Sequence, residues 1–163
     1  MGVLVQPKRV RVQDDLFHGR ERPGTMTDYR ILVTGSRDWG ARLLIASELD
    51  ALLSEHKTLT LVHGACPKGA DAIAHDWACF RRLGPGELVI TEPHPADWGT
   101  HGKRGGFIRN AEMVAAGADL ALAFIAPCSS PKCAGKPAHG SHGATQCAAL
   151  AEKAGIRVRR FTA

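Results

Sequence analysis

The pattern of hydrophobic and polar positions along this chain changes period several times. Short apolar runs predict β-strands, and these runs lie at 30–34, 58–63, 88–91 and 118–126. Apolar residues at helical spacing predict amphipathic helices, and these segments lie within 42–55, 70–78, 107–114 and 144–151. Residues 156–161 alternate apolar and basic side chains, which predicts a fifth strand at a sheet edge with one solvated face.

Strands that alternate with helices predict an α/β fold, because each helix returns the chain to the start of the next parallel strand. We expect a three-layer sandwich with a mostly parallel sheet of five or slightly more strands. Residues 1–28 show no sustained period and predict an N-terminal tail, whereas residues 29–163 form the predicted domain. Residues 92–106 are rich in Pro, His and Gly and predict a long loop. Ligands of such folds bind at the carboxyl ends of the strands, so the loops there are the candidate site.

Composition narrows the class of protein without changing the fold prediction. A chain of 163 residues suits one domain, and 44% hydrophobic with 23% charged residues is typical of a globular protein. The formal net charge of +5 is modest; it suits a small anionic ligand and does not require a nucleic acid. Five cysteines, no signal peptide and no apolar stretch of membrane-spanning length lead us to expect reduced thiols in a cytoplasmic protein without a membrane partner.

Three loops at the predicted strand ends combine small residues with hydroxyl or basic side chains. Small residues leave backbone N–H groups open, and a following helix N-terminus adds partial positive charge, so such loops can bind phosphate. The candidate ligand-binding residues are Thr34, Gly35, Ser36, Arg37, Gly64, Gly69, Asp71, Arg109, Asn110, Gly140, Ser141, His142, Gly143, Ala144 and Thr145. The alternatives are glycines that only form tight turns and an Asp71 that only caps its helix.

Known phosphate and nucleophile motifs are missing from these loops. The loop at Gly35 lacks the later glycines of a dinucleotide fingerprint, and the chain has no Gly-x-x-x-x-Gly-Lys-Ser/Thr run. It also has no Gly-x-Ser-x-Gly elbow. The sequence therefore argues against a P-loop NTPase and against a serine hydrolase of that type.

Four motifs occur in a fixed order along the chain, and they are 30–34 with Gly35-Ser36-Arg37, His63-Gly64 with Gly69-Ala70-Asp71, Arg109-Asn110 with Met113, and the run 140–145. Together they resemble the SLOG superfamily, specifically the YspA, cpYpsA-related family, formerly described as a domain of unknown function. The resemblance implies a Rossmann-like fold and a nucleotide or nucleotide-derived ligand that is sensed or processed. It also implies a homodimer, and it names no certain cofactor. The superfamily includes cytokinin-activating phosphoribohydrolases and a DNA-binding protein of natural transformation.

The sequence departs from the phosphoribohydrolase branch at the position that carries catalysis. Those enzymes look like Gly-Gly-x-Gly-Thr-x-x-Glu, and Ala148 stands where that motif has its glutamate. Arg109 matches the accompanying arginine but cannot act as a general acid or base. The resemblance therefore favours binding over N-glycosidic cleavage, and no catalytic residue is assigned.

A cluster of cysteines and histidines lies between the fourth strand and the last helix. Cys128, Cys133, His139 and His142 are four side chains of the types that bind zinc. Their spacing is not that of a standard zinc finger, so we interpret the segment as a loop with incidental thiols and keep zinc as the alternative. A disulfide between Cys128 and Cys133 is disfavoured in a reducing compartment.

Two other functions remain open beside ligand binding. An enzyme that cleaves or transfers at an N-glycosidic or phosphate bond needs a general base, and the candidates are Asp38, Asp71 and Asp97. A nucleic-acid-binding protein would use the basic tail and the arginines within 157–160. Trp39 and Trp98 are each expected either to stack on a base or to pack as buried anchors.

Overall fold

The computed structural model describes residues 28–81 and 87–163. Residues 1–27, most of the predicted tail, and Gly84, the expected stop of the second helix, lie outside the described residues. The elements in chain order are β1 (Tyr29–Gly35), α1 (Arg42–His56), β2 (Thr58–His63), α2 (Ala70–Arg81), β3 (Leu88–Pro93), α3 (Trp98–His101), the 3-10 turn η1 (Gly102–Arg104), α4 (Gly105–Ala115), β4 (Leu120–Ile125), the 3-10 turn η2 (Pro131–Cys133), α5 (His142–Lys153) and β5 (Arg157–Thr162). Asp28, predicted as the last tail residue, accepts a hydrogen bond of 2.7 Å from the Thr60 hydroxyl of β2.

The five strands form one parallel sheet in the order β3-β2-β1-β4-β5. Every residue of β2 and β4 is buried, because helices cover both faces of these inner strands. β5 lies at the edge, as predicted, and exposes Arg157, Arg159 and Arg160. Because Arg159 and Arg160 are consecutive, they point to opposite faces, so exposed arginines lie on both faces of β5 and not on one as predicted. The predicted α/β, Rossmann-like three-layer fold is confirmed.

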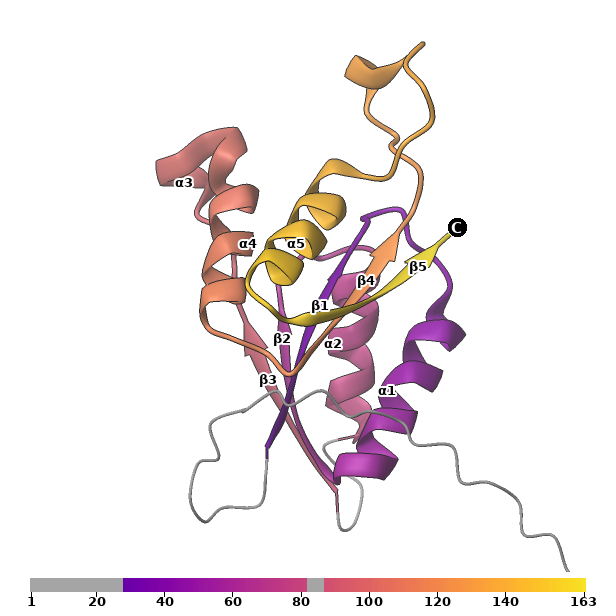
Figure 1. The fold of residues 1–163 in the computed structure, drawn as a ribbon, viewed down its shortest axis with the longest axis vertical. Coiled ribbons are helices and arrows are strands. Elements are labelled where there is room, and N and C mark those ends of the chain that lie inside the picture. The colour runs from indigo at the N-terminus through magenta and orange to yellow at the C-terminus, as the bar shows by residue number, and fades with distance from the viewer. Residues whose placement is uncertain (1–27, 82–86) are drawn as a thin grey trace, which may run out of the picture.

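The side chains of β1 alternate between two hydrophobic cores, one on each face of the sheet. Ile31 and Val33 pack in the core that contains the apolar residues of α1 and α2. Leu32 points to the other face, where it packs with Met113 of α4 and Cys147 of α5. Figure 1 shows the resulting layers, with α1 and α2 on one side of the sheet and α4 and α5 on the other. Among the described residues, no helix has the length and apolar character needed to cross a membrane.

The order of the strands sets the position of the functional edge. The chain moves outward from β1 through β2 to β3, and then crosses back so that β4 pairs with the free side of β1. This reversal sends the loops after β1 and β4 to opposite faces, which opens a crevice at the carboxyl ends of these strands. The helices α2, α4 and α5 all begin at that edge.

The predicted loop at 92–106 is partly helical, which corrects the sequence analysis. It contains α3 and η1, and α4 already begins at Gly105. The Asp97 carboxylate starts α3 by accepting the N–H of Thr100 at 2.9 Å. A Cβ at Gly106, in the first turn of α4, would come within 3.1 Å of the Trp98 ring, so this glycine makes room for the indole.

The buried face of α4 also differs from the prediction. Phe107 and Ala111, expected to mark the apolar face, are exposed. Val114, the third residue expected on this face, is buried as predicted, together with Asn110 and Met113. The reason is that the helix packs on α5 and the sheet through its 110, 113 and 114 positions and turns Phe107 toward the carboxyl edge.

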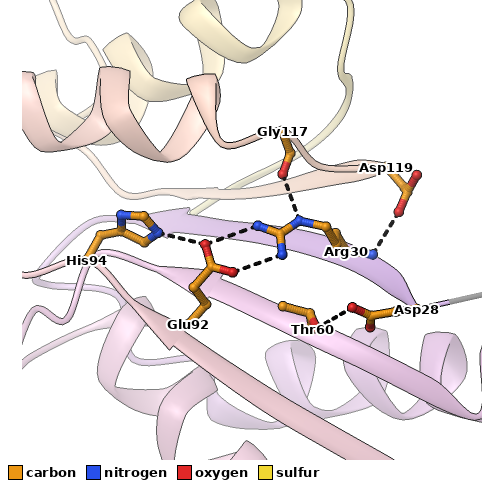
Figure 2. A network of polar contacts seen from close by, with 7 residues as sticks. All are labelled: Asp28, Arg30, Thr60, Glu92, His94, Gly117 and Asp119. Atoms are coloured by element: carbon orange, nitrogen blue, oxygen red, sulfur yellow. Dashed lines mark hydrogen bonds and ion pairs between the residues drawn. The ribbon is translucent and has the colours of Figure 1, made fainter. Parts of the chain in front are cut away.

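An ion-pair network joins the outer strand β3 to the central strand β1, across β2 (Figure 2). The Arg30 guanidinium donates to both carboxylate oxygens of Glu92, at 2.8 and 3.0 Å, and to the carbonyl of Gly117 at 3.1 Å. His94 Nε2 lies 2.9 Å from the same carboxylate. The hydrogen bond from Arg30, followed by that from His94, lowers the pKa of Glu92 to about 2.

We expect Glu92→Gln to lower the free energy of unfolding by about 1 kcal/mol at pH 7, because a partly exposed bidentate pair is lost. The folded pKa of Glu92 lies below its ordinary value of 4.5, so the carboxylate stabilises the fold above that pH and the contribution fades as pH falls toward 2. The variant should therefore lose less stability than the parent between pH 5 and pH 3. Urea unfolding followed by circular dichroism measures this, with the exposed Glu112→Gln as control. Equal losses in both variants would contradict the role assigned to Glu92.

Candidate functional site

A cavity of about 1080 Å³ opens where the carboxyl ends of β1, β2 and β4 meet the starts of α4 and α5. It brings together twelve of the fifteen candidate residues, which are Thr34, Gly35, Ser36, Arg37, Gly64, Asp71, Arg109, Asn110, Ser141, His142, Gly143 and Ala144. These residues come from four separate segments of the chain. Their convergence follows from the parallel sheet, because the loops after parallel strands share one edge.

The remaining three candidates do not line the cavity. Gly69 has a φ of +71°, and a Cβ there would overlap the carbonyl of Ser36, so its role is a close backbone approach before α2. A Cβ at Gly140 would overlap the side chain of Ile125, so this glycine also serves packing. Thr145 lies in the first turn of α5 and is exposed outside the cavity lining.

Ser36 joins three parts of the structure at the floor of the cavity. Its side chain is 3% exposed, and its Oγ accepts the N–H of Ala126 at 2.8 Å. The same oxygen lies 2.5 Å from the hydroxyl oxygen of Ser141. The end of β1, the end of β4 and the start of α5 are thereby tied together, so the Ser36 hydroxyl already has its partners within the protein.

The start of α5 presents open backbone donors to the cavity. Ser141 occupies the N-cap position, but its side chain makes no capping hydrogen bond because it is turned toward Ser36. The first N–H groups of an α-helix have no acceptor within the helix. His142, Gly143 and Ala144 line the cavity at this first turn. The helix start therefore adds hydrogen-bond donors and a partial positive charge to the cavity wall.

Arg109 is held in place from three sides. Its Nε donates to Asn110 Oδ1 at 3.0 Å, and its Nη1 donates to the carbonyls of Gly64 and His94. Asn110 in turn donates to the carbonyl of Gly143 at 3.1 Å and to Gln146 at 2.8 Å, which links α4 to α5. A Cβ at Gly64 would collide with the guanidinium, so any larger residue there would displace Arg109 from this position.

Asp71, in the first turn of α2, contacts the backbone of the loop after β2. It is 5% exposed, and its carboxylate accepts the backbone N–H groups of Gly64 and Cys66. Burial raises the pKa of Asp71 from 3.8 to about 6, against the opposing effects of Arg109, these two N–H groups and Arg37. A carboxyl group with a pKa near 6 can change its protonation state close to neutral pH.

His63 fixes the first residues of the same loop. It is 2% exposed, its Nδ1 accepts the N–H of Ala65 at 3.1 Å, and its Nε2 lies 3.2 Å from His75 Nδ1. Burial, followed by the charges of His75, Arg109 and His94, lowers the pKa of His63 to about 4. The ring is therefore neutral at pH 7, with the lone pair of Nδ1 directed at the loop.

The cavity carries more positive than negative side chains. Its cationic lining residues are Arg37, Lys68, Lys103 and Arg109. Its carboxylates are Asp71 and Asp38, and Asp38 accepts a hydrogen bond from Ser129 at 2.5 Å. Lys68 and Lys103 were missed by the sequence analysis. Lys68 lies between Gly64 and Gly69 in the loop after β2, so the sequence analysis could have added it to the candidate residues. Lys103 lies in η1, which the sequence analysis did not predict.

The tryptophans and Asp97 have different environments. Trp98 lines the cavity at 50% exposure, with the Arg37 guanidinium 5.9 Å from its ring centroid. Trp39 is 5% exposed and packs against Phe124 in the core. Asp97 caps α3 outside the cavity lining.

The part of the chain that the structure describes contains one cluster of side chains that could bind a metal ion. It consists of Cys128, Cys133, His139 and His142, whose ligand atoms lie within 4.8 Å of one another at the cavity rim.

Comparisons with known proteins agree with this architecture. A family model described as YspA, cpYpsA-related SLOG family matches residues 29–101, which include β1, β2, β3 and their loops. The Gene 61 protein of Mycobacterium phage D29 is 43% identical over 136 residues, an alignment that covers 81% of this chain and 95% of the phage protein. No solved structure matches the chain.

We expect His63 to make the fold sensitive to mild acid. The folded protein takes up a proton at His63 near pH 4 and the unfolded chain near pH 6.5, so stability is lost as pH falls through this interval. Between pH 7 and pH 5 this amounts to about 2 kcal/mol. His63→Asn keeps an acceptor for Ala65 without titrating, so its free energy of unfolding should change less over that range. Chemical denaturation at both pH values measures this, with the exposed His101→Asn as control; an unchanged pH dependence in His63→Asn would contradict the assignment.

Proposed function

The chain belongs to the YspA, cpYpsA-related SLOG family, and from this premise we propose that it binds a nucleotide or nucleotide-derived phosphate ligand in the cavity, for sensing or processing. The observation that carries the proposal is the cavity itself, in which four cationic side chains and an open helix start converge at one sheet edge. A volume of about 1080 Å³ is large enough for a nucleotide.

The charge distribution suggests how such a ligand would lie. Its phosphate group would accept hydrogen bonds from the first N–H groups of α5 and from Arg37, which face the cavity. Arg109 would contribute charge from a fixed position, since its hydrogen bonds hold it against Gly64. The base would stack on Trp98, whose indole is half exposed beside Arg37.

Phosphate dependence tests the proposal directly. We expect 5′-nucleotides such as AMP, ADP and ADP-ribose to raise the melting temperature of the protein by several degrees at concentrations well above Kd, and adenosine to have little effect. A single-stranded oligonucleotide serves as the comparison. Stabilisation by the oligonucleotide and by none of the nucleotides would contradict the proposal and favour nucleic-acid binding.

Two variants separate the phosphate from the base subsite. Arg37→Ala should weaken the binding of a nucleotide by roughly 10- to 100-fold and should also weaken the binding of pyrophosphate, because a charged hydrogen-bond donor is lost. Trp98→Ala should weaken the nucleotide roughly tenfold and leave pyrophosphate unchanged, because only stacking is lost. Isothermal titration calorimetry measures both constants. Arg42→Ala and Phe80→Ala, exposed residues of α1 and α2 outside the cavity, are matched controls; an Arg37→Ala variant with unchanged affinity would show that the site is elsewhere.

Asp71 supports one alternative, an enzyme that hydrolyses the bound nucleotide. Its pKa of about 6 suits a general base at neutral pH, and it lines the cavity. Ala148, at the position of the phosphoribohydrolase glutamate, is fully buried in the core, so that reaction lacks its carboxylate here.

If Asp71 is a general base, the rate of release of free base or phosphate should rise as pH increases through 6, because the carboxylate is the active form. Asp71→Asn should then lower the rate by about 100-fold or more while the nucleotide still binds. Chromatography of the reaction mixture over time measures the products. Stable nucleotide after prolonged incubation with the parent protein would rule out the enzymatic alternative and leave binding.

A further inference from the structure

The segment between β4 and α5, residues 127–140, forms an insert that stands above the carboxyl edge of the sheet (Figure 1). Its two ends are paired, since Cys128 N–H donates to the carbonyl of His139 at 2.8 Å and Ser141 N–H donates to that of Ala126 at 3.0 Å. None of residues 127–140 belongs to the hydrophobic core clusters. A segment that buries so little apolar surface needs another source of order.

Four potential metal ligands meet at the base of this insert. Cys128 Sγ lies 3.7 Å from His142 Nε2, Cys133 Sγ lies 3.4 Å from it, and His139 Nε2 lies 3.1 Å from it. All four ligand atoms are within 4.8 Å of one another. A tetrahedral zinc site with Zn–S of about 2.3 Å and Zn–N of about 2.0 Å has S···N edges of about 3.5 Å and N···N edges of about 3.3 Å. The three distances to His142 Nε2 are close to these edges, and the other pairs of ligand atoms lie within 4.8 Å of one another.

Hydrogen bonding alone does not account for this arrangement. His142 Nε2 faces three other atoms, but a ring nitrogen carries at most one hydrogen and can satisfy one of them. His139 Nδ1 donates to the carbonyl of Pro137 at 2.8 Å, so in the neutral ring Nε2 is a lone pair directed at the cluster. Metal-binding histidines almost always donate their other ring N–H to a carbonyl, a carboxylate or water, and His139 meets this condition.

We propose that Cys128, Cys133, His139 and His142 bind one Zn²⁺ ion in a closed, tetrahedral site. Binding replaces the two thiol protons, which pass to solvent, with two zinc–thiolate bonds. Four protein ligands leave no open position, so the ion has a structural role: it fastens the insert to the first turn of α5. The His142 side chain is then committed to the metal, and this residue contributes only its backbone to the neighbouring cavity.

The sequence spacing favours incidental thiols, and the geometry reverses that preference. The other three cysteines are not part of this cluster: Cys147 is buried in the core, and Cys66 and Cys79 lie elsewhere in the described structure. A set of two thiolates and two imidazoles that lie this close together is typical of zinc and poorly suited to magnesium or calcium, which prefer oxygen ligands.

Metal content tests the proposal independently of any nucleotide. The full chain, purified without a histidine tag and in a non-chelating reductant, should contain about one zinc per chain by elemental analysis. Cobalt exchanged into the site should show the visible absorption of tetrahedral Co²⁺ with thiolate ligands. Cys128→Ser combined with Cys133→Ser should lower the zinc content at least tenfold, whereas the exposed Cys79→Ser should leave it unchanged.

Limited proteolysis reports on the structural role. Lys132 is exposed within the insert, and trypsin should cut after it much faster once a chelator has removed the metal. Re-addition of zinc should restore protection in the parent and in Cys79→Ser, but not in the double variant. Protein that contains no zinc and takes none up, or that carries a Cys128–Cys133 disulfide under these conditions, would overturn the proposal.

Discussion

The arrangement of the carboxyl edge depends on one buried hydroxyl group. Ser36 Oγ holds the N–H of Ala126 and the hydroxyl of Ser141, so it joins β1, β4 and α5 at the point where the strand order reverses. These partners lie far apart in the sequence, and each would be left unsatisfied in the protein interior if the edge opened. The separation of β1 and β4 is therefore fixed by satisfied polar groups as well as by packing, and the cavity keeps its shape around that point.

A second set of contacts fixes the backbone of the loop after β2. Asp71 holds the N–H groups of Gly64 and Cys66, while Arg109 holds the Gly64 carbonyl. The carboxylate and the guanidinium thus fix the same short loop from two sides. Their charges partly compensate each other, so Arg37, Lys68 and Lys103 supply most of the unbalanced positive charge that faces the cavity. The most buried charges, those of Asp71 and Arg109, therefore fix the loop, and Arg37, Lys68 and Lys103 are the side chains that leave positive charge on the cavity wall.

The sequence predicts the strands and the meeting of the loops well, because both follow from simple periodicity and the geometry of parallel sheets. It does not show which of these residues also serve the packing of the edge. Gly35 looks like a phosphate-loop glycine, yet a Cβ there would lie 2.9 Å from the carbonyl oxygen of Phe124 and would overlap Ala70, so packing alone demands it. The Ser36 hydroxyl, a candidate phosphate ligand, already makes two hydrogen bonds within the protein. The helical turns at 98–104 begin at Asp97, whose side chain caps α3; this local signal is present in the sequence, although the sequence analysis predicts only a loop there.

The first turn of α5 belongs both to the cavity wall and to the proposed metal site. An N-cap serine ordinarily secures its helix through its side chain, but Ser141 gives its hydroxyl to Ser36. The first turn must therefore be held by other contacts, and Asn110 provides one of them through the carbonyl of Gly143. In the proposed metal site, the imidazole of His142 provides the other from the opposite side. The backbone N–H groups of this turn can then remain open toward the cavity without the helix fraying, which is the condition for a preorganised anion site.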